Sequence, residues 1–168
     1  WILHSTFLIQ LGAQYQILVD PVLESIDGYV GFLMQFADTF ELQASPPVST
    51  KEINSFFRTK NRKNIVAISH DHFDHLNWNT IEELPDDTHF YVPLGVEKDF
   101  PSRFSQVTGM DWYTSDTLDD LKITFLPANH RSGRSLNNGN KTLWGGWLFE
   151  WKGRRIYFAG DSGYSDVF

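Results

Sequence analysis

Three histidines fall within six consecutive positions of the chain, in the run from Ser69 to His75 (SHDHFDH). They directly follow the apolar run 64–69 (NIVAIS), which predicts a short buried strand that leads into this loop. Histidines two positions apart in a loop can turn their ring nitrogens toward one point, and a following aspartate and histidine can reach a second point. Neutral imidazoles and carboxylates suit Zn²⁺, Mn²⁺ or iron better than Ca²⁺. A chance cluster in a solvated loop is the weaker interpretation, so the pattern predicts a metal site.

Two more candidate ligands follow predicted strands further along the chain. His130 comes after the apolar run 122–126, and Asp161 comes after the run 155–159. Taken alone, either residue would more often be structural than a ligand. Because both follow strand ends, as the histidine cluster does, a single convergent site is the better interpretation.

Strands alternate with short helices along the rest of the sequence. Ser49 and Glu52 have the spacing of a capping box and predict a helix that runs to about Arg58. Further helical segments are expected at 77–84 and 95–100, a strand at 89–93, and hairpins from 3–11 with 15–19 and from 143–151 with 155–159. This mixture predicts an α/β layered fold.

Composition excludes several classes of protein. The 168 residues are enough for one domain with a core, so we expect a single domain over 1–168. The absence of cysteine excludes a disulfide framework, a thiolate metal site and a cysteine nucleophile. A net charge of -7 argues against binding to nucleic acid by bulk charge. No apolar stretch has the length of a membrane span or the pattern of a signal peptide.

The order of the candidate ligands resembles that of a known superfamily. His-x-His-x-Asp-His, then a lone histidine, then Ala-Gly-Asp is the motif order of the metallo-β-lactamase superfamily. Further runs resemble the N-acyl-phosphatidylethanolamine-hydrolysing phospholipase D family within it, from Trp1 to about Tyr164: WxxHST at 1–6, DP at 20–21, VPLG at 92–95, NKxLWG at 140–145 and FAGDxGY at 158–164. The ascorbate-phosphate lactonase branch shares only part of these runs.

The resemblance implies an αββα sandwich with a two-metal centre, for which zinc is the expected metal. His70, His72 and His130 would hold one ion, Asp74 and His75 would hold the other, and Asp161 would bridge both. The family takes one further histidine from a later motif, which these 168 residues do not contain. We therefore expect the chain to be a domain truncated at its C-terminal end, and also at its N-terminal end because it begins at Trp1.

The expected function is a metal-dependent hydrolase of the phospholipase D type. A metal-bound hydroxide would attack the phosphodiester of N-acyl-phosphatidylethanolamine, with Asp74 and Asp161 holding the ions. Asp71 is a candidate proton acceptor, or equally a cap for the loop backbone. A sugar-phosphate lactonase, another small-molecule hydrolase of this fold, and a metal-binding homologue without catalysis remain alternatives. Fold alone does not separate them.

Several residues carry weaker expectations. Asp20 would orient ligand histidines from behind, with a simple turn residue as its alternative. His4 matches a family motif position near the site, or is a satisfied core group. Three cations, Arg131, Arg134 and Lys141, could contact a phosphate, although an ordinary surface loop is the favoured interpretation. Segment 28–40 could form an acyl-chain wall or a membrane-facing edge, although core packing is favoured there. His89 receives no function.

The expected partners follow from this function. We expect a phospholipid or a phosphorylated small molecule as substrate, no nucleic acid, and contact with a membrane surface from a cytoplasmic or peripheral-membrane location. The sequence leaves the oligomeric state open.

Overall fold

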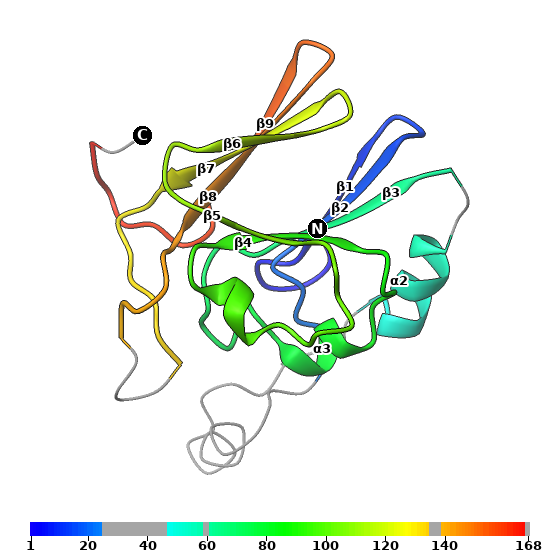
Figure 1. Ribbon diagram of the computed structural model, residues 1–168, viewed down its shortest axis with the longest axis horizontal. Coiled ribbons are helices and arrows are strands. Elements are labelled where there is room, and N and C mark those ends of the chain that lie inside the picture. The colour runs from blue at the N-terminus through cyan, green and yellow to red at the C-terminus, as the bar shows by residue number, and fades with distance from the viewer. Residues whose placement is uncertain (25–46, 59–60, 135–138, 167–168) are drawn as a thin grey trace.

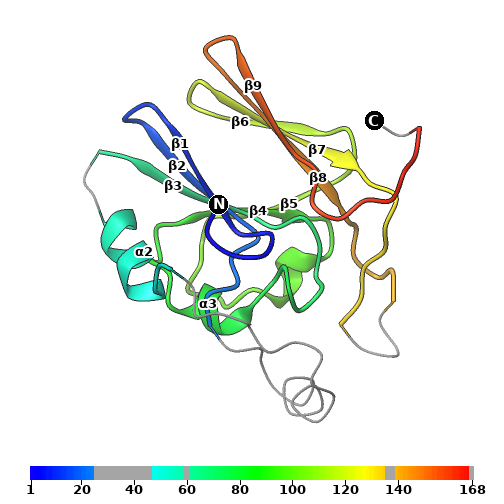
Figure 2. The same ribbon diagram turned by 180° about the vertical axis from the view of Figure 1, so that it is seen from behind.

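The structure, a computed structural model, describes residues 1–24, 47–58, 61–134 and 139–166 (Figure 1). Two β-sheets pack face to face, and the described helices lie on the outer side of the first sheet (Figures 1 and 2). The elements of that first half are β1 (Phe7–Leu11), β2 (Tyr15–Val19), α2 (Thr50–Phe57), β3 (Lys63–Ala67), α3 (Trp78–Glu82), β4 (His89–Pro93), the 3-10 helix η1 (Val96–Asp99) and β5 (Val107–Met110).

The first sheet has the strand order β1-β2-β3-β4-β5. β1 and β2 form the expected antiparallel hairpin, in which Leu11 pairs with Tyr15. The other neighbours are parallel. The paired strand begins at Phe7 and not at Leu3. Residues Leu3 and Thr6 instead form an isolated β-bridge, with a tight turn of the chain between them.

The central strands of this sheet are buried on both faces, which explains their nearly continuous apolar sequences. Alternate residues point to opposite sides. Ile17 and Ile65 face the second sheet and join the core between the sheets, whereas Leu18 and Val66 face the helices and pack in a separate core with Ile53. All five side chains are fully or almost fully buried.

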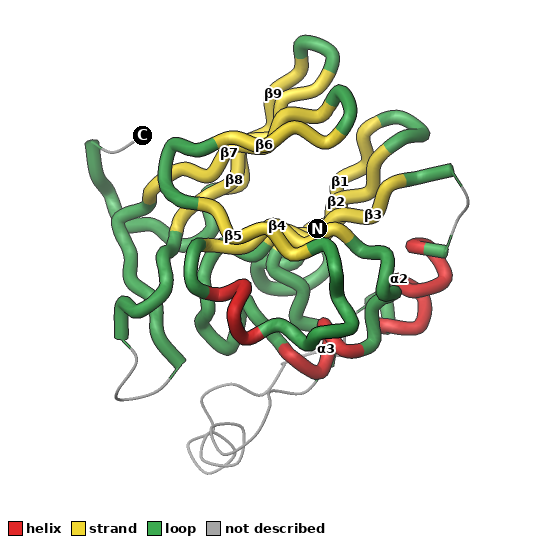
Figure 3. Tube along the Cα trace, viewed as in Figure 1, coloured by secondary structure: helices red, strands yellow, loops and turns green. Residues whose placement is uncertain are grey.

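The second sheet is antiparallel and contains β6 (Ser115–Leu118), β7 (Leu121–Pro127), β8 (Gly145–Trp151) and β9 (Arg154–Phe158), in that order (Figure 3). Its inner face carries Phe125 and Trp147, which stack with ring centroids 4.6 Å apart. On its outer face Lys122 and Arg155 both pair with Glu150. No helix among the described residues covers this outer face (Figure 1), so the part described here is an α-β-β arrangement.

Two hydrogen bonds join the sheets at the end of β3. The Trp147 indole N–H donates to the carbonyl of Ile68 over 2.9 Å, and the backbone N–H of Gly145 donates to the carbonyl of Ser69 over 2.9 Å. The start of β8 is thus tied to the residues that immediately precede the histidine cluster.

Helix α2 begins with the capping box that the sequence predicts. The Ser49 hydroxyl accepts from the N–H of Glu52, and the Glu52 carboxylate accepts from the N–H of Ser49 over 2.8 Å. Replacing an N-cap serine by alanine removes one of these acceptors, so we expect Ser49→Ala to lower the free energy of unfolding by about 1 kcal/mol in urea titrations.

Ser55→Ala is the matched control for this prediction. Ser55 lies exposed within the same helix, where alanine has the higher helix propensity. The Ser55 variant should be as stable as the parent or slightly more so. Equal stabilities for the two variants would contradict a capping role for Ser49.

Candidate metal centre

Three loops meet at one end of the two sheets. They follow β3, β7 and β9 and carry the cluster that ends at His75, then His130, then Asp161. The close approach depends on Gly160, whose φ is +60° and at which an added Cβ would lie 2.7 Å from the Cβ of Ser69. Glycine is therefore needed directly before Asp161 on grounds of both conformation and space.

The ring nitrogens of three histidines converge at the first position. His70 Nε2 lies 2.8 Å from His72 Nδ1, and His130 Nε2 lies 3.2 Å and 3.3 Å from these two atoms. Nitrogens that ligate zinc tetrahedrally at about 2.0–2.1 Å are about 3.3–3.4 Å apart. The spacing of the three nitrogens thus fits one shared cation.

The same environment keeps these imidazoles neutral, which ligation requires. Burial, together with the charges of the neighbouring histidines, lowers the pKa of His70 to about 2. Burial is also the main cause that lowers the pKa of His72 and of His130. All three rings therefore offer a lone pair at neutral pH.

A second group of donors lies beside the first and contains His4, Asp74 and His75. His75 Nε2 is 3.9 Å from Asp74 Oδ2 and 3.4 Å from Asp161 Oδ1. This nitrogen is buried and has no hydrogen-bond partner among the described residues. A buried polar atom without a partner is costly, and a cation held by these carboxylates would satisfy it.

Asp161 faces both groups. Its Oδ1 is 3.4 Å from His75 Nε2, and its Oδ2 is 3.8 Å from His130 Nε2. The close approach of His75 is the main cause that lowers the pKa of Asp161, with the charges of His70 and His130 acting in the same direction. Asp161 is therefore a carboxylate at neutral pH, with one oxygen toward each donor group.

Asp20 lies fully buried behind the histidines and holds two of them through hydrogen bonds. His75 Nδ1 is 2.6 Å from its carboxylate, so the ring donates there, and the neutral ring has its lone pair on Nε2. The hydroxyl of Ser69 donates to the same carboxylate over 2.6 Å and lies 2.9 Å from His70 Nδ1. Asp20 thus orients His75 directly and His70 through Ser69.

The sequence pattern predicts no role for Ser69. The signal was its position, between a buried strand and the histidine cluster, but a serine at a strand end is too common to single out. In the structure it is buried and connects the carboxylate of Asp20 to the ring of His70.

The imidazole of His75 is surrounded by carboxylates, an environment that favours a positive charge. Burial lowers the pKa of this imidazole, but the carboxylates of Asp20, Asp161 and Asp74 act in the opposite direction and raise it to about 10. The proton on His75 is stabilised by the same negative groups that would bind a divalent ion. Binding through Nε2 therefore has to displace that proton.

Asp71 and Arg134 hold the loop that follows His130. The Asp71 carboxylate is buried and accepts from the N–H of Gly133 over 2.6 Å, which is the backbone-capping contact considered for it. Arg134 donates to the carbonyls of Asp71 and Leu76 and lies over the ring of Phe73. Its guanidinium thus fastens the two loops together.

The remaining candidate residues from the sequence do not take part in holding these loops together. Arg131 and Lys141 are exposed on the same loop. His4 is not a core group, because half of its side-chain surface is exposed, and it lies 3.2 Å from Asp74. His89 lies on β4 and belongs to neither donor group. Segment 28–40, the candidate acyl-chain wall, lies outside the described residues.

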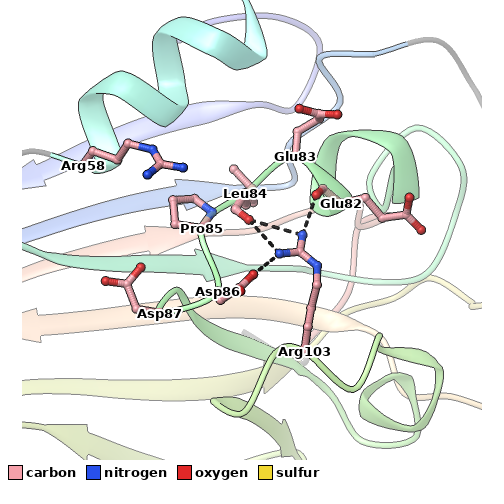
Figure 4. Close-up of a pocket in the computed structure, with 8 residues that line it drawn as sticks. All are labelled: Arg58, Glu82, Glu83, Leu84, Pro85, Asp86, Asp87 and Arg103. Atoms are coloured by element: carbon pink, nitrogen blue, oxygen red, sulfur yellow. Dashed lines mark hydrogen bonds and ion pairs between the residues drawn. The ribbon is translucent and has the colours of Figure 1, made fainter.

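A separate hollow of about 430 Å³ lies near the end of α3 (Figure 4). Arg103 reaches into it, donates to the carbonyls of Glu82 and Leu84, and forms an ion pair with Asp86. These contacts cap the end of α3, so the polar groups in this hollow serve the fold.

A family comparison supports the assignment of a metal centre at these loops. A family model described as "Beta-lactamase superfamily domain" matches residues 15–167, which is most of the chain. The chain belongs to the metallo-β-lactamase superfamily. The fold and the His/Asp clusters together indicate a metal-binding centre at the loops described above.

Relatives within the superfamily have different names. The chain is 35% identical to an uncharacterised protein of Mycobacterium tuberculosis, over 100% of the chain and 43% of that protein. It is 27% identical to N-acyl-phosphatidylethanolamine-hydrolyzing phospholipase D 1 of Caenorhabditis elegans, over 99% of the chain and 47% of that protein. A "Probable L-ascorbate-6-phosphate lactonase" of Salmonella newport is 26% identical over 61% of the chain and 34% of that protein.

The chain spans less than half the length of these relatives. Among solved structures, a possible metal-dependent hydrolase from Veillonella parvula superposes with a TM-score of 0.66 at 20% identity, covering 99% of the chain and 63% of that protein. This likeness supports the α/β sandwich.

None of the described helices combines the length and the apolar character needed to cross a membrane.

Proposed function

We propose that the protein carrying this chain is a two-metal hydrolase that cleaves the phosphodiester bond of N-acyl-phosphatidylethanolamine, with zinc as the expected metal. The observation that carries the proposal is Asp161, whose two carboxylate oxygens face His130 on one side and His75 on the other. His70, His72 and His130 would hold one ion, and Asp74 and His75 the other. Such ions would supply Lewis acidity, which lowers the pKa of a bound water and polarises a phosphoryl oxygen.

The residues of the chain have distinct tasks in this proposal. Asp20 fixes the tautomer of His75, and Ser69 transmits the same constraint to His70. Asp71 and Arg134 keep the loop of His130 against the first loop. Preorganised ligands of this kind avoid the cost of reorganisation during the reaction. In the overall reaction, one water adds across the bond between phosphorus and the N-acylethanolamine oxygen, releasing phosphatidic acid and N-acylethanolamine.

The substrate class is supported by similarity and by sequence runs near the site. The relative from C. elegans is named for this activity. The runs 140–145 and 160–164, on which the resemblance to that family depends, lie in the loops that contain or adjoin the proposed ligands. A phospholipid substrate would also bring the protein to a membrane surface, which we include in the proposal as peripheral contact from the cytoplasmic side.

A sugar-phosphate lactonase is the second candidate, because the Salmonella relative named as one matches 61% of the chain. The two activities differ in the electrophile, which is phosphorus in one and a carbonyl carbon in the other. The same metal centre could serve either.

Substrate competition tests the choice. For the full-length protein loaded with zinc, we expect kcat/KM for an N-acyl phospholipid to exceed that for a phosphorylated lactone by about tenfold or more. A chelator should abolish hydrolysis and added zinc should restore it. A preference for the lactone would overturn the phospholipase assignment.

A second measurement tests the metal centre itself. His72→Ala should lose bound metal and activity together, and His89→Ala, which changes a histidine outside the donor groups, should keep both. A parent protein with less than one equivalent of metal, and with activity that survives His72→Ala, would show that the protein is not a metalloenzyme.

A further inference from the structure

His4 lies in the N-terminal turn but its ring reaches the second donor group. Its Nε2 is 3.2 Å from Asp74 Oδ2, and its ring centroid is 5.5 Å from that of His75. One donor atom each from His4, Asp74 and His75 lie within 4.8 Å of one another. Two nitrogens and one carboxylate oxygen at this spacing form a donor set that suits zinc or a similar divalent ion.

The backbone around His4 is held in an uncommon conformation. His4 has a φ of +44°, in the left-handed region that non-glycine residues rarely adopt. The indole N–H of Trp1 donates to the His4 carbonyl over 2.8 Å, and the N–H of Thr6 closes the turn on the carbonyl of Leu3. Conformations of this kind persist where surrounding contacts over-determine them, and they cluster at functional sites.

The turn is also fastened to the segment that orients His75. The Thr6 hydroxyl donates to the carbonyl of Asp20 over 2.8 Å and accepts from the N–H of Val22. Thr6 is fully buried. The His4 turn is therefore fastened to the backbone of Asp20, whose carboxylate contacts the far side of the His75 ring.

The unsatisfied atom at the centre of this arrangement is His75 Nε2. It is fully buried, it has no hydrogen-bond partner among the described residues, and it points to the same region as His4 Nε2 and Asp74 Oδ2. We propose that His4 is a ligand of the second metal ion, contributing Nε2 beside Asp74 and His75. This inference rests on the proposed two-metal centre and adds a protein ligand to it.

A positioning role for His4 would produce the same contact between its ring and Asp74 in the metal-free protein. In that role the ring serves only as a hydrogen-bond donor that orients the Asp74 carboxylate. Glutamine separates the two roles, because its amide N–H can donate to Asp74 whereas its amide is a poor zinc ligand.

The test measures zinc binding to the full-length protein by competition with a chromophoric chelator. For His4→Ala and for His4→Gln, we expect the weaker-bound ion to lose affinity by about tenfold or more. The tighter ion should be unaffected. The visible absorption of the cobalt-loaded protein should change in both variants, because the second site loses one of its two nitrogen donors. His89→Ala is the control, and circular dichroism of the metal-free variants should match the parent.

The outcomes separate this inference from the proposed function. If the parent binds two ions and His4→Gln binds them with unchanged affinity, His4 only positions Asp74 and the inference is wrong while the two-metal centre stands. Unchanged affinity in His4→Ala would exclude both roles for His4. If the parent binds no metal, the proposed function and this inference fail together.

Discussion

Replacing Asp161 by alanine is expected to reduce hydrolysis by about a thousandfold or more and to lower the metal content from two ions toward one. Asp161 is the carboxylate that faces both donor groups, so its loss weakens both positions at once. Stabilisation of developing charge by metal ions contributes several kcal/mol, and about 4 kcal/mol corresponds to a thousandfold in rate. Steady-state kinetics and elemental analysis of the purified full-length variant would measure the two effects.

Asp166→Ala provides the matched control for that experiment. Asp166 is an exposed aspartate five positions later in the same segment, and it belongs to none of the donor groups. It should leave rate and metal content unchanged. Full metal content and a normal rate in Asp161→Ala would exclude a bridging role for Asp161.

The second large effect is expected at Asp20. Its carboxylate is fully buried and accepts from the N–H and hydroxyl of Ser69 and from the ring of His75, at 2.6–2.7 Å. Asp20→Ala leaves these donors without an acceptor. Removing one partner of a buried charged pair costs about 3–5 kcal/mol, so we expect a loss of this size in urea denaturation.

Backbone strain complicates this experiment, because Asp20 has a φ of +41°. Asp119 is a suitable control, since it is an aspartate with a φ of +53° whose only described ion pair is an exposed contact with Lys63. Asp119→Ala incurs a similar backbone penalty without the buried network. A loss of stability in Asp20→Ala no larger than that in Asp119→Ala would contradict the role assigned to Asp20.

Asp20→Asn gives a further readout that stability alone does not. Asparagine keeps the shape and tolerates a left-handed backbone. Its amide group would donate to His75 Nδ1 and shift the ring proton to Nε2, the atom needed for a cation. We expect this variant to remain folded and to bind the second ion more weakly.

The sequence predicted the parts of the fold that are buried on both sides. The strands around Ile17, Ile65 and Phe90 were recognisable because burial on both faces leaves long apolar runs. The edge strands β5 and β6 were not predicted, since their residues are mostly exposed or half-buried and carry little pattern. The parallel pairing of β2 with β3 and of β3 with β4 depends on tertiary packing and has no local signal.

The candidate site divides in a similar way. The convergence of His130 and Asp161 with the cluster was predicted from one shared feature, that each follows a predicted strand. That β3 lies in the first sheet, and β7 and β9 in the second, had no signal in the sequence. The structure adds contacts that no spacing reveals. Ser69 connects Asp20 to His70, and the turn at His4 lies against Asp74 although seventy positions separate them in the chain.

The distribution of the candidate ligands over loops from two sheets has a consequence for the unfolded chain. The cluster from His70 to His75 is local in sequence, so a denatured chain would retain some affinity for zinc through it. His130 and Asp161 join the cluster only after the second sheet has packed on the first. Only binding in excess of that to the unfolded state stabilises a protein. We therefore expect the contribution of metal to folding to come from the proposed ligands outside the cluster, which are His4, His130 and Asp161.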